Sequence, residues 1–583
     1  MNKNMSDTLP VICENAGRTI EVAMGTTLLE VERQLRLDGP HPFLAAYVNN
    51  RIKELNYRIY KPVTVRFIDI TSFEGIRVYQ RTISFILQKA VRELFPDRTL
   101  YIRHSLGASG FYCEISGFGP IPAEHLDAIK ARMRGIIDRN LPIQGVKMLT
   151  DTARKIYEGF GMTDKIALLD SRPRLYSKIY TIDSLPGYFY GALTPSTGYT
   201  PQFDLHSYYN GFFIALPLRT DPTRLHQSVH QEKMFDVFHQ YQSWVEIMGV
   251  PTVGQLNSKV LAGDASELIK IAEAFHENKL AQVAGCVAEA NRERGVRLVL
   301  ISGPSSSGKT TFAKRLGVQL RVLGLNPVLI SLDDYFVDRE KTPRDENGEY
   351  DYEALEAIDL EQFNDHLKRL ERGESVDIPR YDFISGTRQW HDNPLQLDER
   401  SVLIVEGIHG LNPALTPGVP ESRKFKIYVS CFTSVALDNV SRIATSDNRL
   451  LRRLTRLEHG KRRFVRVRIR CGNCESAVTA LVDSGNLLCD PLSGDPVLIL
   501  PRNTFRRLTH LPEGSTLLPG MRLLRARTAS GITLMIVLRP DGIFLLSGWK
   551  ETALRGLIGC ALSGGGVHQP VMPESMVSAI LCK

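Results

Sequence analysis

The clearest chemistry in this sequence lies in "GPSSSGKTT", residues 303–311, which follows an apolar run and precedes an amphipathic one. The stretch matches the pattern GxxxxGK[ST]. Glycines let backbone N–H groups close around phosphate oxygens, the lysine reaches the outer phosphates, and the threonine hydroxyl is a Mg²⁺ ligand. We therefore predict a nucleotide site formed by Gly303, Ser305, Ser306, Ser307, Gly308, Lys309, Thr310 and Thr311.

Three carboxylates follow apolar runs and are the candidates for metal and proton chemistry. Asp333 and Asp334 end "PVLISLDD", and Glu406 ends "SVLIVE"; both runs predict buried strands. Carboxylates at strand ends beside a phosphate loop hold Mg²⁺ or accept a hydroxyl proton. We expect Thr310, Asp333 and Glu406 around the metal, while Asp334 is as well explained by a loop cap.

A fourth carboxylate, Asp483, stands in the triplet Asp-Ser-Gly after the apolar run "TALV". Asp-Ser-Gly-Asn is also a good turn sequence, so the triplet alone favours a turn. An aspartic protease needs two carboxylates that share a proton, and this region offers one such triplet. If Asp483 is catalytic, a second chain has to supply the other carboxylate across a two-fold axis.

The basic charge of the chain is concentrated in one segment, residues 449–470, with ten basic residues and one acid, whereas the whole chain carries +8. The remainder is close to neutral, so we expect no nucleic-acid partner. Within the segment, "RFVRVRIR" alternates apolar and basic residues, which predicts a half-exposed strand. The segment is thus a helix followed by the first strand of another domain.

Length and composition indicate a multidomain globular protein. There are 583 residues, 43% of them hydrophobic, and nine cysteines without a disulfide-like framework. Cys471 and Cys474 form one CxxC, but no second ligand pair follows, so we predict no zinc site. The N-terminus has no signal-peptide pattern and no run has the length of a membrane span, so we expect a cytoplasmic protein.

Periodicity divides the chain into regions of different character. Short apolar runs at 9–72 predict a strand–helix–strand unit, and Tyr79, Ile83, Ile86, Leu87, Ala90, Val91 and Leu94 form one helical stripe. A long amphipathic helix is predicted over 266–294, before the buried strand that precedes the phosphate loop. From Phe464 onward the runs are strand-like and broken by Gly, Pro and Asp, so we predict an all-β domain.

The segment from Leu298 to Arg456 resembles the uridine kinase and phosphoribulokinase family. The resemblance implies ATP and Mg²⁺ as cofactors and Asp333 as general base. It also implies a nucleoside-side loop "RYDFISGTRQW" with Tyr381 and Arg388 at the substrate. Gly386 stands where uridine kinases often place a histidine, which puts uridine itself in question.

The same resemblance assigns "DNRLLRRLTR" to the start of a lid helix. Arginines of this helix neutralise charge on the phosphoryl group during transfer, and Arg453 and Arg456 fit that role. The sequence after Arg456 departs from the family. We therefore expect a sheet without its last strand, with an exposed edge that favours misfolding unless it is covered.

The N-terminal half resembles two modules of threonyl-tRNA synthetases. Residues 9–72 are similar to the ubiquitin-like TGS module, and 73–230 to the second additional domain. The paired histidines of that domain are matched here by Arg81 and Phe85, which supply no base for editing chemistry. We expect a binding or positioning module, with an inert packing domain as the alternative, joined by a helical connector over 231–296.

The stretch "ALVDSGNLLCDPLSGDPVLI", with the later "LIGCALSGGGVHQPVMPESM", resembles the protease half of the sporulation sigma-E factor processing peptidase. The resemblance covers 464–579 and implies an aspartic peptidase with Asp483 as the catalytic residue. It also implies a pro-sigma factor peptide as substrate and a homodimer formed through this domain. The membrane-embedded half of that family is absent from this sequence.

The sequence therefore predicts α+β N-terminal modules, an α/β P-loop kinase domain with a truncated parallel sheet at 297–456, and an all-β aspartic-protease-like domain. The expected function is ATP-dependent phosphorylation of a nucleoside or similar small hydroxyl compound, fused to a peptidase. Two alternatives remain at this point. In one, only the C-terminal domain acts, as a dimeric endopeptidase that activates a sporulation sigma factor. In the other, the chain is a nucleotide-binding regulator without turnover.

Overall fold

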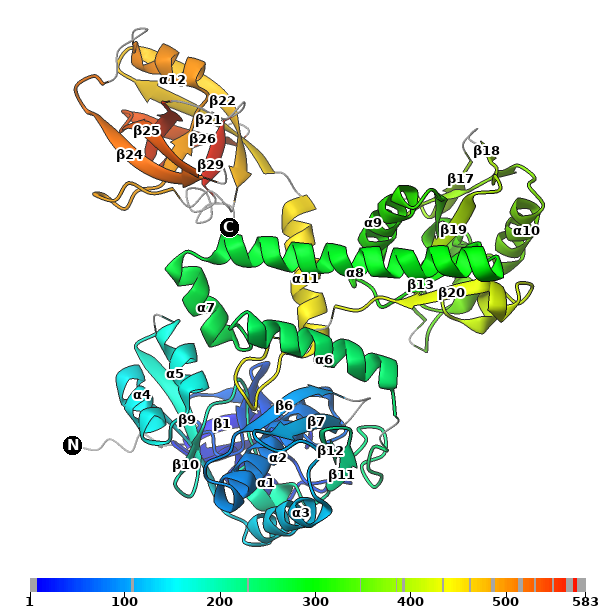
Figure 1. Cartoon of the computed structure of the whole chain (residues 1–583). Helices are drawn as coiled ribbons and strands as arrows, with labels where there is room; N and C mark the ends of the chain where they lie inside the picture. The colour runs from blue at the N-terminus through cyan, green and yellow to red at the C-terminus, as the bar shows by residue number, and fades with distance from the viewer. Residues whose placement is uncertain are drawn as a thin grey trace. The chain divides into compact units, whose positions relative to one another are not determined.

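A computed structural model describes residues 8–573 except 106–109, 173, 228–229, 347, 384, 391–393, 432–434, 461–462, 484–487, 512–516, 529–530, 548–549 and 563–569. The chain divides into two compact units, Met1–Arg449 and Leu450–Lys583. Figure 1 shows the chain coloured from the N-terminus to the C-terminus. Within the described residues, no helix is both long and apolar enough to cross a membrane.

The first unit begins with a mixed five-stranded sheet and one helix. The strand order is β2-β1-β5-β3-β4, and β1 pairs with β5 in parallel. A capping box starts the helix, because the Thr27 side chain accepts from the Glu30 N–H and Glu30 reaches back to the Thr27 N–H. The elements are β1 (Thr8–Cys13), β2 (Arg18–Ala23), α1 (Leu28–Leu35), β3 (Ala45–Val48), β4 (Arg51–Glu54) and β5 (Val63–Ile68).

The next module packs two antiparallel sheets around the long helix α2 (Phe73–Leu94). The predicted stripe on α2 is buried except for Leu94, which is 37% exposed at the end of the helix. Phe85 is fully buried against Phe189, so it belongs to the core. The other elements are β6 (Leu100–Ser105), β7 (Gly110–Ile115), α3 (Ala123–Asp138), β8 (Ile143–Leu149), α4 (Thr150–Gly159), α5 (Thr163–Asp170), β9 (Tyr176–Ile182), β10 (Leu185–Gly187), β11 (Asp204–Tyr208) and β12 (Gly211–Ala215).

Three helices follow: α6 (Glu232–Ile247), α7 (Val253–Ala262) and α8 (Ala265–Arg294). The predicted helix over 266–294 is confirmed as α8, which ends at Gly295 in the left-handed conformation. Leu280, Ala284 and Val287 of α8 are buried in one core with β13 and α9 of the next region. This long helix therefore covers part of the sheet that carries the phosphate loop.

The central region is a four-stranded parallel sheet in the order β14-β19-β13-β20. Helices α8 and α9 contribute to the core on one face of β13 and β19, and α10 to the core on the other. The elements are β13 (Leu298–Ser302), α9 (Lys309–Val322), β14 (Asn326–Ser331), α10 (Leu360–Glu371), β15 (Val376–Asp377), β16 (Arg380–Asp382), β17 (Thr387–Gln389), β18 (Pro394–Leu395), β19 (Ser401–Glu406) and β20 (Lys424–Tyr428).

The sequence prediction of this sheet missed one strand and misjudged another. β20 was not predicted because "KFKIY" carries two lysines. It lies at the edge beside β13, where charged side chains discourage pairing with other strands. β14 was expected to be buried but forms the opposite edge, with Leu329 38% exposed. The fully buried strands are β13 and β19.

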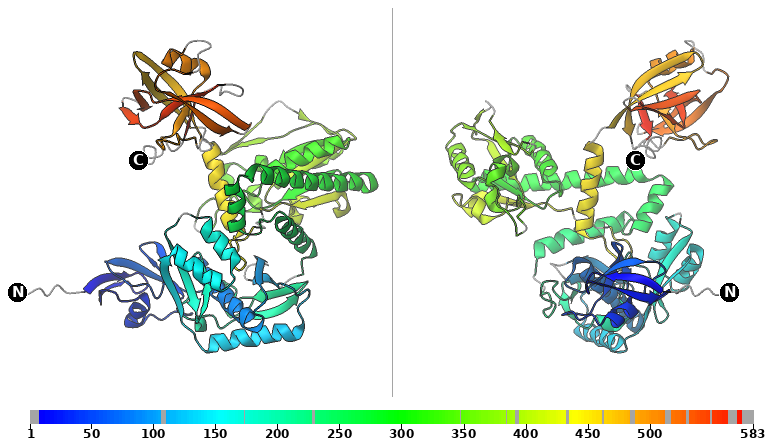
Figure 2. Two further views of the ribbon diagram at one scale, coloured as in Figure 1. Left: turned by 60° about the vertical axis from the view of Figure 1, so that its left-hand side comes forward. Right: turned by 180° about the vertical axis from the view of Figure 1, so that it is seen from behind.

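The second unit contains most of α11 (Thr445–Gly460) and a nine-stranded sheet in the order β24-β25-β28-β23-β29-β22-β21-β26-β27. The two views of Figure 2 show this sheet, in orange to red, folded back on itself. Its strands are β21 (Arg463–Cys471), β22 (Cys474–Asp483), β23 (Val497–Ile499), β24 (Met521–Thr528), β25 (Gly531–Leu538), β26 (Gly542–Ser547), β27 (Lys550–Leu554), β28 (Leu557–Ala561) and β29 (Val571–Pro573).

The half-exposed strand predicted from "RFVRVRIR" is confirmed, because Val467 and Ile469 of β21 are fully buried while Arg466 and Arg470 are exposed. The all-β prediction is wrong in one respect. The unit contains a helix, α12 (Arg502–Thr509), which inserts Phe505 and Leu508 into the core. The sequence did not predict α12, because three arginines surround its apolar pair, Phe505 and Leu508, which are spaced i and i+3 as on one face of a helix.

After β20, the chain binds to the N-terminal module through residues 435–442. The Lys165 ammonium lies 2.9 Å from the Asp438 carboxylate, and both side chains are 1% exposed. The Asn439 N–H donates to Asp164, and the Asn439 carbonyl accepts from the Ile102 N–H. A buried ion pair with this many backbone bonds holds the segment in one position.

We expect Lys165→Met to lower the free energy of unfolding by about 3 to 5 kcal/mol, because it leaves the Asp438 carboxylate buried and unpaired. Lys178→Met is the matched control, since Lys178 pairs with Glu54 at a partly exposed site and should cost about 1 kcal/mol or less. Denaturant unfolding of both variants measures the difference. Equal losses would contradict the prediction, and adding Asp438→Leu to Lys165→Met should restore most of the stability.

Candidate functional site

The phosphate loop connects the central strand β13 to α9. A Cβ at Gly303 would overlap the carbonyl oxygen of Val429, so this position requires glycine. Gly308 has φ of 98°, a left-handed conformation that suits glycine, and it caps the N-terminus of α9. The Ser307 hydroxyl is buried and has no hydrogen-bond partner in the described part of the chain. An unsatisfied buried donor in such a loop fits a phosphate oxygen as its partner.

The loop and the metal candidates meet at the carboxyl ends of the strands. The Thr310 hydroxyl donates to the Glu406 carboxylate over 2.8 Å, and the Ser331 hydroxyl lies 3.3 Å from the same oxygen. Glu406 is 6% exposed at the end of β19, which lies between β13 and β14 in the sheet. The parallel register thus brings Thr310 and Glu406 together, as the sequence predicted. Ser331 was missed, although it directly precedes Leu332 and Asp333.

Asp333 lies in a short 3-10 helix, Leu332–Tyr335, directly after β14. Burial raises the pKa of its carboxyl, and the charge of Glu406 raises it further, while Lys309 opposes the shift. Burial likewise lowers the pKa of the Lys309 ammonium, against the opposing charges of Glu406 and Asp333. The charge of Glu406 therefore disfavours ionisation of the Asp333 carboxyl.

These residues fit Mg²⁺ by the chemistry of their donors. The site offers two carboxylates and a hydroxyl, and Mg²⁺ in phosphotransfer sites takes one or two carboxylates and completes its shell with phosphate oxygens and water. No cluster of three or more His, Cys, Asp or Glu side chains that could hold a metal ion occurs in the described residues.

Asp334 is next to Asp333 but makes a different contact. Its carboxyl accepts the backbone N–H of Tyr381, which opposes the rise in pKa that burial causes. Asp334 therefore ties the loop containing Tyr381 to the end of β14. This contact supports the capping interpretation of Asp334.

The two predicted substrate residues lie in different surroundings. Tyr381 is 5% exposed and packs with Phe336 and Phe383. The Arg388 guanidinium lies 2.9 Å from Asp359 and lines a pocket of about 420 Å³. The other residues of that pocket are Asp338, Asp359, Glu361, Gln362, Asp365 and Trp390. Tyr381 is thus a core residue, and Arg388 belongs to an acid-rich pocket.

An arginine that the sequence analysis did not select contacts the loop. The Arg449 guanidinium donates to the Ser305 carbonyl over 2.9 Å. Arg449 is the first basic residue of the 449–470 segment. In the sequence, only its positive charge suggested that it could contact a phosphate-binding loop. Arg453 lies on α11 in the second unit, and the side chain of Arg456 is outside the described residues.

The Asp483 triplet is only partly described. Asp483 ends β22, where its backbone pairs with Pro573 of β29. Its side chain, and Ser484 and Gly485, lie outside the described residues. The structure therefore places the strand that carries Asp483 but not its carboxylate.

A central parallel strand, a glycine-rich loop and a helix that begins at the lysine define a P-loop nucleotide-binding domain. Residues 298–443 match the phosphoribulokinase/uridine kinase family model. Uridine kinase of Staphylococcus aureus strain JH9 is 31% identical over 163 residues, which cover 28% of this chain and 69% of that protein. The chain belongs to the phosphoribulokinase/uridine kinase family.

Two other regions resemble different proteins. Residues 446–519 match the family model of sporulation factor SpoIIGA. The N-terminal half matches threonine–tRNA ligases, such as that of Clostridium kluyveri strain ATCC 8527, 28% identical over 157 residues. That match covers 27% of this chain and 24% of the ligase. The chain spans only about a quarter to a third of the ligases it matches.

A solved structure described as a possible uridine kinase from Bacillus stearothermophilus shares 26% identity, with a TM-score of 0.20, over 23% of this chain and 71% of the other.

The family matches also locate the junction between the two families. The kinase match ends at 443 and the SpoIIGA match begins at 446. Arg449, Arg453 and Arg456 therefore lie outside the residues matched to the kinase family.

We expect Arg449→Ala to accelerate amide hydrogen exchange in the loop 303–308 by roughly tenfold, because a charged hydrogen bond contributes about 1.5 to 3 kcal/mol. Arg452→Ala, at an exposed position of the same helix, is the control and should leave the exchange unchanged. Hydrogen exchange with mass spectrometry reports both. Unchanged exchange in Arg449→Ala would show that this contact does not order the loop.

Proposed function

We propose that residues 297–456 transfer the terminal phosphoryl group of ATP to a hydroxyl of a nucleoside or similar small compound in the cytoplasm. The observation that carries the proposal is the contact between Thr310 and Glu406 beside Asp333. A loop that only bound nucleotide would not need a second carboxylate, that of the more exposed Asp333, beside the buried Glu406 and the metal-binding hydroxyl. Membership of the phosphoribulokinase/uridine kinase family supports phosphotransfer.

We assign each residue a role in this reaction. Lys309 and the N-terminus of α9 bind the phosphates, and Thr310 and Glu406 hold Mg²⁺, which neutralises phosphate charge when bound. Asp333 accepts the proton of the acceptor hydroxyl as the oxygen attacks phosphorus. Its raised pKa makes it a stronger base than an ordinary aspartate. Arg453 and Arg456 are proposed to neutralise the transferring group from the lid helix.

The pocket beside Arg388 is the proposed site for the acceptor. Asp338, Asp359, Glu361 and Asp365 line it, and its arginine is already paired with Asp359. Four carboxylates repel a phosphorylated acceptor but accept hydrogen bonds from hydroxyl groups. Trp390, 53% exposed, offers a flat apolar surface. This lining favours an uncharged polyhydroxyl compound such as a nucleoside.

We expect Asp333→Asn to lower the rate of phosphoryl transfer by at least about 10²-fold, because the amide accepts no proton. In the unmodified protein, kcat/KM should fall as the pH drops through the raised pKa of Asp333, since the base has to be deprotonated. A coupled assay over a panel of nucleosides, with ATP and Mg²⁺, measures both.

Asp377→Asn, at an exposed position of β15, is the control and should retain the full rate. If phosphoryl transfer survives in Asp333→Asn, Asp333 is not the base. If no nucleoside is phosphorylated while ATP binds, the regulatory alternative replaces the kinase function.

A second function is proposed for the C-terminal unit, on the basis of the SpoIIGA match over 446–519, which includes Asp483. We propose an aspartic endopeptidase that acts on a pro-sigma factor peptide. One chain supplies one Asp483, and two carboxylates a few ångströms apart share a proton because both cannot ionise cheaply. The active form is therefore a homodimer in which each chain contributes Asp483.

We expect Asp483→Asn to abolish cleavage of a pro-sigma-type peptide, in mixed dimers as well, because one amide breaks the shared-proton pair. The specific activity of the full chain should rise with protein concentration and then reach a plateau as dimers form. A dilution series with the Asn variant alongside tests both. Cleavage by the variant at every concentration would instead identify Asp483 as a turn residue.

A further inference from the structure

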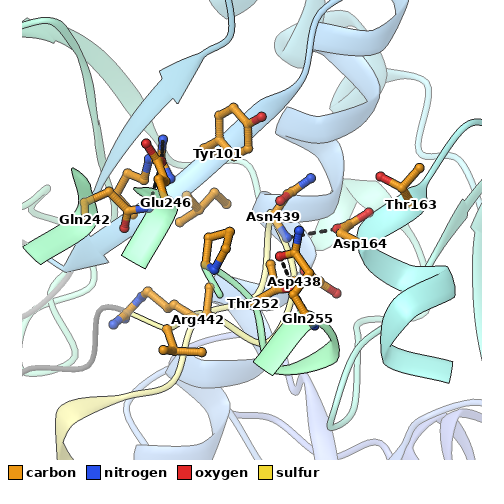
Figure 3. Close-up of a pocket in the computed structure, with 15 residues that line it drawn as sticks. Tyr101, Thr163, Asp164, Gln242, Glu246, Thr252, Gln255, Asp438, Asn439 and Arg442 are labelled. Atoms are coloured by element: carbon orange, nitrogen blue, oxygen red, sulfur yellow. Dashed lines mark hydrogen bonds and ion pairs between the residues drawn. The ribbon is translucent and has the colours of Figure 1, made fainter. Parts of the chain in front are cut away.

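A cavity of about 220 Å³ lies in the first unit, away from the phosphate loop. Five segments line it: Tyr101–Arg103 of β6, the start of α5, the end of α6, the start of α7, and residues 435–442 after β20. In Figure 3, Tyr101, Glu246, Asn439 and Asp164 surround the cavity. Polar side chains dominate this wall, so the cavity suits a polar occupant.

Most charges around the cavity are matched within the protein. The Arg103 guanidinium lies 2.7 Å from Glu114 and 3.0 Å from Glu246. The Lys165 ammonium pairs with Asp438, as described above. The charges of Arg103 and Lys165 are therefore already balanced by carboxylates of the protein.

Arg442 is different, because no carboxylate lies within ion-pair distance of its guanidinium in the described part of the chain. It donates to the Ser105 hydroxyl over 3.1 Å and lies 4.6 Å from the centre of the Phe111 ring. Burial lowers its pKa to about 10. The Arg442 side chain is half-buried, and a partly desolvated guanidinium without a counterion gains from an anionic partner.

Two carboxylates on the cavity wall have capacity for a donor. One oxygen of Asp164 accepts the Asn439 N–H, and one oxygen of Glu246 accepts the Gln242 amide in addition to Arg103. An ionised carboxylate has about four acceptor positions, so both can accept more hydrogen bonds. A protonated amine suits these two residues, as a carboxylate suits Arg442.

The volume limits the size of the occupant. The cavity has a volume of about 220 Å³. Pockets for drug-sized ligands start near about 300 Å³. A nucleoside triphosphate is too large, whereas a molecule with an amine and a carboxylate on a short carbon skeleton fits.

We propose that this cavity is a binding site for a small zwitterion of the α-amino-acid class, with its carboxylate toward Arg442 and its ammonium toward Asp164 and Glu246. The site is distinct from the ATP site and does not depend on the kinase function. Its wall includes residues 435–442, which lead into α11 and to Arg449 at the phosphate loop.

The test compares three probes on the full chain by calorimetry: L-alanine, propionate, which lacks the amine, and ethylamine, which lacks the carboxylate. We expect saturable one-site binding of L-alanine with a Kd at or below about 1 mM, and at least about tenfold weaker binding of the other two. Absence of saturable L-alanine binding up to about 10 mM, or equal binding of propionate, would overturn the proposal.

Two variants assign the binding to this cavity. Arg442→Ala removes the unpaired guanidinium and should abolish L-alanine binding, while Arg442→Lys should retain part of it. Gln242→Trp fills the cavity from the half-buried end of α6 and leaves Arg442 unchanged, so it should also abolish binding. Arg51→Ala, at an exposed position of β4, is the control. Full binding by folded Arg442→Ala or Gln242→Trp would place the ligand elsewhere.

Discussion

The parallel register of β13, β14 and β19 is the constraint on which the site depends. Because the three strands run in the same direction, their carboxyl ends meet at one edge of the sheet. Glu406 ends the strand between the other two, so it reaches Thr310 on one side and Ser331 on the other. Glu406 and Ser331 are each fixed at the end of a strand, and Thr310 is fixed in the first turn of α9, which follows β13.

The segment after β20, together with the first turn of α11, links this edge to the N-terminal module. Asp438 is paired with Lys165, Asp447 lies 3.1 Å from Arg77 of α2, and Arg449 donates to the Ser305 carbonyl. These contacts occur within a short stretch of chain. They tie this stretch to the N-terminal module through Asp438 and Asp447 and to the phosphate loop through Arg449.

The sequence predicted the parts of the site that depend on local pattern. The loop, α8 and the carboxylates at strand ends each have a motif or a period that specifies them. The contacts of Arg449 and Tyr381 could not be predicted, because they join residues distant in sequence whose types are common on protein surfaces and in cores. β20 and α12 were missed because lysines and arginines obscured their apolar positions.

Helix α11 spans both the boundary between the two compact units and the boundary between the two family matches, so no single residue separates the two regions. It runs from Thr445 to Gly460, whereas the kinase-family match ends at 443 and the first unit ends at Arg449. Positions 449, 453 and 456 are spaced i, i+4 and i+7, so they share one face of the helix. Arg449, which donates to the phosphate loop, therefore stands on a helix whose residues are matched to SpoIIGA from 446 onward.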